Sequence, residues 1–158
     1  MLNICFVCLG NICRSPTAEG IMIQLVKDSG LTNQISIDSA GTSAYHIGEP
    51  ADPRSRAAAK NHHISLPSRA RQFKAGDFER FDYVVAMDQS NQKNLIRMAH
   101  SKTDREKIVL LRNFDSKSTK DSDVPDPYYG GPNGFETVFQ ICLAGCDGLL
   151  NAVIQNGL

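Results

Sequence analysis

The sequence lacks an excess of charge of either sign. Its 17 Lys and Arg residues balance 17 Asp and Glu residues, which gives a formal net charge of +0 at pH 7. Proteins that bind nucleic acid or an anionic membrane through their overall charge carry a clear excess of basic residues. We therefore expect no nucleic-acid partner, and any attraction for an anion has to come from a local arrangement of donors.

Long hydrophobic runs are also missing. We expect no segment of membrane-spanning length, and Arg14 interrupts the apolar start too early for a secretory signal. The five cysteines are an odd number without the regular spacing of a disulfide framework. These absences predict no membrane insertion, a cytoplasmic location and reduced thiols.

Short apolar runs alternate with helical patterns along the chain. Strand patterns occupy residues 4–7, 35–41, 83–87 and 108–111, and helical patterns occupy residues 16–28, 54–61, 89–98 and 133–156. Such alternation predicts an α/β fold with a parallel sheet flanked by helices on both faces. The length of 158 residues fits one domain, 1–158. Residues 65–76 are expected to be irregular and residues 115–123 to form a mobile loop.

The stretch from Cys8 to Ser15 joins the first expected strand to the first expected helix, which Pro16 is suited to begin. A loop that enters a helix directs unpaired backbone N–H groups toward one point, where the helix dipole adds partial positive charge. Gly10 and Asn11 are the residues best able to adopt positive φ and curl these amides inward. Arg14 adds a planar charged fork that matches two phosphate oxygens. The stretch therefore predicts an oxyanion site.

Cys8 begins this loop and lies in the same field, which should lower its pKa and favour the thiolate. Ser15 is placed to donate a hydrogen bond to that sulfur. A cysteine after an apolar strand is more often a small buried hydrophobe, as we expect for Cys5 and Cys142. Metal binding by Cys5, Cys8 and Cys13 is the other alternative, but no Cys or His pair follows at a suitable spacing. We expect no metal and no cofactor.

The loop reads Val-Cys-Leu-Gly-Asn-Ile-Cys-Arg-Ser-Pro, and this Cys-x5-Arg-Ser pattern resembles the signature of the low-molecular-weight protein tyrosine phosphatases. Further landmarks of that family follow in the same order, so that the resemblance covers essentially the whole chain: Asp38-Ser39-Ala40-Gly41-Thr42, Asp52-Pro53-Arg54, Ala70-Arg71-Gln72, Met87-Asp88-Gln89-Ser90-Asn91 and Asp126-Pro127-Tyr128-Tyr129. The resemblance implies a four-stranded parallel sheet and hydrolysis of phosphotyrosine and small aryl phosphates, with a tyrosine-phosphorylated protein as substrate.

Phosphate monoester hydrolysis needs a nucleophile, a charge clamp and an acid. Cys8 is expected to attack phosphorus and form a cysteinyl phosphate, while Arg14 and the loop amides stabilise the phosphate oxygens. The acid has to come from elsewhere, and Asp126 follows the expected mobile loop and precedes Pro127, which favours an extended backbone. Position alone leaves a turn-forming Asp-Pro as the alternative; the resemblance favours Asp126 as acid and then as base for water.

Other residues are expected to contact the substrate or support the loop. We expect substrate contacts from the rest of the loop and from aromatic side chains that wall the cleft, namely Leu9, Gly10, Asn11, Ile12, Cys13, Ser15, Tyr45, Tyr128 and Tyr129. Ser39 and Asp88 are expected to support the loop, with helix capping as the alternative for Asp88. Asp52 and Arg54 are assigned to structure.

Through the resemblance, four residues bear on specificity or on support of the loop. Tyr45 stands where many relatives carry Trp, and Ile12 stands where relatives that act on phosphoarginine tend to carry Thr, which favours phosphotyrosine. Relatives of the animal type often have a His before the Ala-Arg-Gln run, where Ser68 and Arg69 stand here. The resemblance also implies a reversible disulfide between Cys8 and Cys13, with plain packing as the alternative for Cys13.

Other functions lack the residues that they need. An arsenate reductase of this fold relays a disulfide through further thiols, but no cysteine lies between Cys13 and Cys142. A non-catalytic phosphoprotein-binding module would have lost Cys8, Arg14 or Asp126. Neither a Walker loop nor a Gly-x-Gly-x-x-Gly turn occurs. We therefore interpret the chain as a phosphatase, and expect a monomer with a weak dimer as the alternative.

Overall fold

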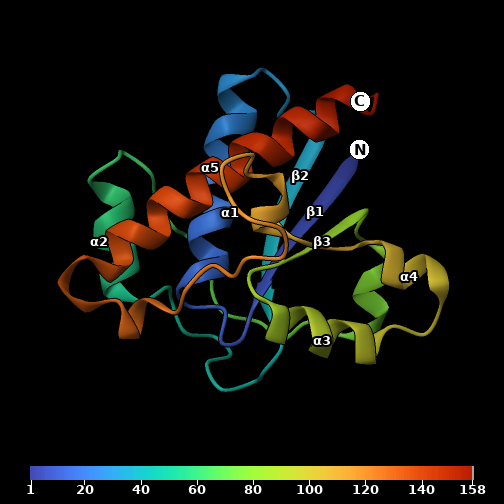
Figure 1. The fold of residues 1–158 in the computed structure, drawn as a ribbon, viewed down its shortest axis with the longest axis horizontal. Helices are drawn as coiled ribbons and strands as arrows, with labels where there is room; N and C mark the ends of the chain where they lie inside the picture. The colour runs from blue at the N-terminus through green and yellow to red at the C-terminus, as the bar shows by residue number, and fades with distance from the viewer. Residues whose placement is uncertain (158) are drawn as a thin grey trace.

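Strand β1 (Leu2–Cys8) lies inside a four-stranded, all-parallel sheet with the order β2-β1-β3-β4 in the computed structural model, which describes residues 1–157 (Figure 1). The other strands are β2 (Ile35–Gly41), β3 (Tyr83–Ala86) and β4 (Ile108–Leu110). Residues 4–8 are buried, as expected for a strand covered on both faces. The predicted α/β fold and its four-stranded parallel sheet are confirmed.

Within residues 1–157, five α-helices and four short 3₁₀ helices surround the sheet. The α-helices are α1 (Arg14–Asp28), α2 (Pro53–Lys60), α3 (Gln89–Met98), α4 (Lys102–Glu106) and α5 (Gly134–Gln155). The 3₁₀ helices are η1 (Ala75–Glu79), η2 (Leu111–Phe114), η3 (Pro127–Tyr129) and η4 (Gly131–Asn133). In Figure 1, α1, α2 and α5 lie together, away from α3 and α4.

The sheet divides the interior into two hydrophobic cores, because successive side chains of a strand point to opposite faces. Ile4, Phe6 and Cys8 of β1 pack with α1 and α5, whereas Cys5 and Val7 pack with residues of α3 and η1. Cys5 and Cys8 therefore belong to different cores. This separation explains why the two thiols do not form a common ligand set.

The structure corrects some of the expected boundaries. Helix α1 begins at Arg14, two residues before Pro16, which is tolerated there because N–H groups in the first turn have no helical acceptor. Leu111 belongs to η2 and not to the last strand. The helices α4 and η1 were not predicted. Helix α4 buries no residue and so shows no apolar periodicity; Ser101 caps it by accepting a hydrogen bond from the Asp104 N–H at 3.0 Å.

Helix α5 corrects the expectation that no segment is long and apolar enough to span a membrane. Residues Gly131–Gln155 reach that length and hydropathy. Here the helix is the central packing element of one core, in contact with α1 and η2. The buried side of α5 includes Val138, Phe139, Cys142, Cys146, Leu149 and Val153, whereas Phe135 near its start is only half-buried.

Candidate active site

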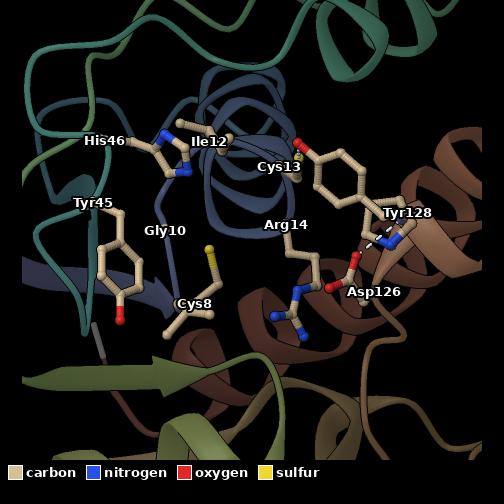
Figure 2. Close-up of a pocket in the computed structure, with 11 residues that line it drawn as sticks. Cys8, Gly10, Ile12, Cys13, Arg14, Tyr45, His46, Asp126 and Tyr128 are labelled. Carbon is tan, nitrogen blue, oxygen red and sulfur yellow. Dashed lines mark hydrogen bonds between the residues drawn. The ribbon is translucent and has the colours of Figure 1, made fainter.

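A pocket of about 200 Å³ opens at the carboxyl edge of the sheet, where β1 ends and α1 begins (Figure 2). Figure 2 shows the Cys8 side chain directed into it between Tyr45 and Arg14. The lining residues come from the β1–α1 loop, the segment after β2 and the start of η3, namely Cys8, Leu9, Gly10, Ile12, Cys13, Arg14, Tyr45, His46, Asp126, Pro127 and Tyr128. Three segments distant in the sequence thus meet around one cysteine.

Asn11 lies beneath the loop and fixes its curvature. Its backbone has φ 58°, and its side chain is 2% exposed. The side-chain Nδ2 donates to Ser15 Oγ at 2.8 Å and to Ser39 Oγ at 2.9 Å, while Oδ1 accepts from the Arg71 N–H at 3.1 Å. Asn11 has the expected positive φ, and its bond to Ser39 shows how Ser39 supports the loop. A left-handed residue inside the loop turns the neighbouring peptide groups toward the anion side.

Gly10 does not have the expected positive φ. Its lack of a side chain matters for another reason, because a Cβ there would lie 2.9 Å from His46 Cδ2. His46 was not predicted as a site residue, although it follows Tyr45 in the same loop. Its ring Nδ1 hydrogen-bonds to the Glu49 carboxylate. The close approach of His46 to Gly10 brings the segment after β2 against the anion loop.

The hydroxyl of Ser15 is oriented toward Cys8. The Arg71 N–H donates to Asn11 Oδ1, so the amide group of Asn11 must be the donor to Ser15. Because Ser15 Oγ accepts that bond, its own hydrogen is available to Cys8 Sγ, 3.0 Å away, or to the more distant Ala40 carbonyl at 3.5 Å. Ser15 is fully buried and therefore supports the sulfur from below instead of lining the pocket.

Glu19 on α1 continues this network away from the pocket. Its Oε1 accepts from Ser39 Oγ at 2.7 Å, and the hydroxyl of Ser68 also lowers the pKa of Glu19. Burial raises the pKa of Glu19, and the two hydroxyls oppose that rise only partly. Ser68, one of the two residues where animal relatives often have a His, therefore solvates a buried carboxyl.

Arg14 lies between Cys8 and Asp126 (Figure 2). Two acceptors outside the pocket fix the direction of its guanidinium. Its Nη1 donates to Asp88 Oδ2 at 2.6 Å and to the Val124 carbonyl at 3.1 Å. Burial alone would lower the pKa of Arg14, but the nearby Cys8 and Asp88 raise it, so the guanidinium stays charged. Asp88 also accepts from the Asn91 N–H at 2.7 Å, so it both orients Arg14 and caps α3.

Asp126 enters the pocket across from Cys8. Its backbone is extended, with φ −71° and ψ 120°, as predicted for a residue before Pro127. One carboxylate oxygen accepts from the Tyr128 N–H at 2.9 Å, which is drawn as a dashed line in Figure 2. The Tyr128 hydroxyl in turn donates to Asp52 Oδ2 at 2.9 Å. Asp52, the N-cap of α2, therefore contacts the site, whereas we expected it to have a structural role only.

The remaining expected residues differ in how close they lie to the pocket. Leu9, Ile12, Cys13, Tyr45 and Tyr128 line it, whereas Tyr129 does not and is 89% exposed. Burial raises the pKa of the Cys13 thiol to about 11, and the thiol lies 3.8 Å from the Tyr128 hydroxyl. Among residues 1–157, no group of three or more His, Cys, Asp and Glu side chains is arranged to hold a metal ion.

A cysteine in a loop that leads into a helix N-terminus, with an arginine beside it and a carboxyl opposite, is suited to covalent transfer of a phosphoryl group. Fold and site together define an enzyme that acts on phosphate esters. The comparison with known proteins is more specific: the chain belongs to the low molecular weight phosphotyrosine protein phosphatase family, whose model matches residues 3–157. It is a hydrolase of phosphotyrosine-containing proteins.

Two curated relatives illustrate the match. A low molecular weight protein-tyrosine-phosphatase of Streptomyces coelicolor is 47% identical over 152 residues, which cover 96% of this chain and 93% of the relative. The human low molecular weight phosphotyrosine protein phosphatase is 44% identical over 149 residues, which cover 94% and 93% of the two chains.

Solved structures share the whole fold. A protein tyrosine phosphatase from Entamoeba histolytica, with Hepes in its active site, superposes with a TM-score of 0.93 at 37% identity and full coverage of both chains (100% and 100%). A Drosophila protein described as an arginine phosphatase superposes with a TM-score of 0.87 at 33% identity, covering 95% of this chain and 96% of that chain. Proteins that share this fold therefore include more than one described substrate class.

Proposed function

We propose that this protein hydrolyses phosphotyrosine and small aryl phosphates through a cysteinyl-phosphate intermediate. Cys8 is the nucleophile, Arg14 is the phosphate clamp, and Asp126 is the general acid and then the general base. The observation that carries the proposal is the placement of Cys8 and Asp126 on opposite sides of one pocket with Arg14 between them (Figure 2). An in-line displacement needs the nucleophile and the acid on opposite sides of phosphorus.

In the first step the Cys8 thiolate attacks phosphorus, so that an S–P bond forms as the bond from phosphorus to the aryl oxygen breaks. Asp126 transfers its proton to the leaving oxygen, and the product is a neutral phenol. The Ser15 hydroxyl, 3.0 Å from the sulfur, stabilises the thiolate before the attack and after its release. Arg14 and the loop amides stabilise the charge on the equatorial oxygens.

In the second step the Asp126 carboxylate takes a proton from water, whose oxygen attacks phosphorus. The S–P bond breaks, the thiolate is restored and inorganic phosphate leaves. Both steps use groups that the chain itself provides, so we expect turnover to persist in an excess of chelator. We also expect a bell-shaped pH profile, because one step needs a thiolate together with a protonated carboxyl.

The walls of the pocket favour an aryl substrate over phosphoarginine. Tyr45 and Tyr128 line it with aromatic surface that packs with a phenyl ring, and Ile12 offers no acceptor for the N–H groups of a phosphoarginine. Arsenate reduction is disfavoured because Cys142 and Cys146 are fully buried on α5 in the core and offer no exposed relay thiol.

The intermediate can be tested directly by rapid quenching with ³²P-labelled aryl phosphate. The wild-type protein should carry label bound to Cys8, and Cys8→Ser should carry none while it still binds vanadate. Asp126→Ala should accumulate more label from p-nitrophenyl phosphate, whose leaving group needs little help, because the base for the second step is missing. Label on any residue other than Cys8 would overturn the proposed mechanism.

A further inference from the structure

We propose that Asp52, Arg54 and Tyr128 form a latch that sets the position of the Asp126 carboxyl relative to the β1–α1 loop. The latch is a set of positioning residues, and it rests on the proposed function of Asp126 as the proton donor. Its parts come from the start of α2 and from η3, which the chain separates by 76 residues between Asp52 and Tyr128.

One end of the latch is fixed to the anion loop. The Asp52 N–H donates to the Ile12 carbonyl at 2.7 Å, so the backbone of Asp52 follows that of the loop. The Asp52 carboxylate caps α2 by accepting from the Arg54 N–H at 2.8 Å. Asp52 is only 8% exposed. A capped, buried residue that is bonded to the loop backbone provides a rigid anchor.

The other end of the latch holds the acid. Tyr128 uses its hydroxyl to donate to Asp52 Oδ2 and its backbone N–H to donate to Asp126 Oδ1, both at 2.9 Å. Pro127 stands between Asp126 and Tyr128 and removes one backbone rotation from the connection. The position of the Asp126 carboxyl is therefore tied through one residue to the anchor on the anion loop.

Arg54 stiffens the latch from outside. Its Nε and Nη2 donate to the two carboxylate oxygens of Asp52, each at 3.1 Å, and its guanidinium lies 4.6 Å from the ring centres of both Tyr128 and Phe135. Burial opposes ionisation of Asp52, but the bonds from Arg54 and Tyr128 outweigh it and lower the pKa of Asp52. Asp52 therefore stays ionised and accepts hydrogen bonds. Burial of the Tyr128 hydroxyl and its bond to Asp52 raise the pKa of Tyr128, so the hydroxyl keeps its proton and donates.

This geometry separates two roles of Tyr128. Its ring is part of the pocket wall, whereas its hydroxyl donates to Asp52 in the latch and lies 3.8 Å from the Cys13 thiol. Tyr128→Phe keeps the wall and removes the hydrogen bond to Asp52. If the acid is misplaced, the loss of kcat/KM must be larger for a leaving group that needs a proton. If only wall contact is lost, the loss of kcat/KM must be the same for both leaving groups.

The test compares kcat/KM for phenyl phosphate, a poor leaving group, with that for p-nitrophenyl phosphate, because kcat/KM contains only the steps up to loss of the phenol. Tyr128→Phe should lower the value by about tenfold for phenyl phosphate and by about twofold or less for p-nitrophenyl phosphate. Vanadate affinity should be unchanged, since the anion loop is intact. The matched control is Tyr83→Phe at the opposite end of β3, which should change neither substrate's value.

Equal losses on the two substrates would overturn the latch and leave Tyr128 as wall alone. In the Asp126→Ala background, adding Tyr128→Phe should cause no further selective loss on phenyl phosphate; a further selective loss also contradicts the latch. The proposed function is tested separately by Asp126→Ala alone. If that variant does not discriminate between the two leaving groups, the acid assignment fails, and the latch fails with it.

Discussion

Arg14 shows how much a single side chain depends on its neighbours. Its Nη1 is occupied by Asp88 and by the Val124 carbonyl, so the guanidinium is fixed in direction. The edge formed by Nε and Nη2 is then left for two oxygens of a bound phosphate, which a planar fork can contact at once.

Replacing Arg14 with Lys should therefore harm the enzyme although it keeps the charge. We expect Arg14→Lys to lower kcat/KM on p-nitrophenyl phosphate by about 10²–10³-fold, because an ammonium cannot reproduce the two parallel hydrogen bonds. Vanadate affinity should fall as well. Steady-state kinetics and vanadate titration measure both effects, with Arg97→Lys on α3 as the control. Wild-type kinetics in Arg14→Lys would show that only the charge matters.

Cys13 is expected to protect Cys8 from lasting oxidation. Because burial raises the pKa of Cys13 to about 11, peroxide should oxidise Cys8 first, to a sulfenic acid. The Cys13 thiol can then attack this sulfur, forming a disulfide and releasing water. After peroxide and then dithiothreitol, the wild type should regain most of its starting activity and Cys13→Ser only a small fraction of its own. Peptide mapping that finds no Cys8–Cys13 link would leave Cys13 as a packing residue.

At the level of elements, the sequence predicts best what depends on neighbouring residues. The strands β1 and β3 were predicted because a strand covered on both faces is a run of apolar residues. The loop from Cys8 to Ser15 was predicted because its geometry follows from a strand, a turn and a helix start. Helix α4 was not predicted, because nothing in it is buried and its pattern has no apolar face.

The parts of the site that were missed depend on contacts between distant segments. The bond from Tyr128 to Asp52 joins residues 76 positions apart, and the approach of His46 to Gly10 joins two separate loops. No local sequence pattern predicts either contact. Both form only when the connections between strands bring the carboxyl ends of the parallel strands to the same edge of the sheet. A glycine can be needed in an anion loop either because its φ is positive or because another group comes close to its backbone. The structure shows that close approach by His46 is the reason at Gly10.

The contact between α1 and β2 should make stability depend on pH. Burial raises the pKa of Glu19 above 4.5, its value in the unfolded chain, so the folded protein holds this proton more tightly. The stabilisation that comes from this proton is fully present below pH 4.5 and is lost as the pH rises through the pKa of Glu19 in the folded protein. Glu19→Gln keeps an acceptor for Ser39 and removes the titration. It should match the wild type at pH 4 and exceed its unfolding free energy at pH 8, as measured by urea denaturation; the reverse order would contradict this.

For the whole molecule, α5 is the element that joins separate parts of the fold. It packs against α1, α2 and η2, and it also contacts η3, the short helix that follows Asp126. At Gly148 the helix approaches η2 so closely that a Cβ would lie 1.8 Å from the Phe114 carbonyl oxygen. Backbone atoms cannot move aside as a flexible side chain can, so the helix and η2 would have to separate.

Gly148→Ala should therefore destabilise the whole domain by about 2–3 kcal/mol, in spite of the better helix propensity of alanine. Urea unfolding monitored by circular dichroism measures the loss. The control is Gly76→Ala in η1, where a Cβ would meet no atom within 4 Å and the change should stay within about 0.5 kcal/mol. Equal stability of the two variants would show that η2 yields without cost.

The order of strands in the sheet also affects how the chain matures during synthesis. Strand β1 is made first, yet its two neighbours, β2 and β3, begin only at Ile35 and Tyr83. A nascent chain therefore presents an apolar strand, with a reactive thiol at its end, long before the sheet can cover it. Asp88 and Asp126 follow later still. An unfinished polypeptide thus has its nucleophile and Arg14 before it has the carboxylate that orients Arg14 or a proton donor, and it gains chemical competence only after the last strand has been made.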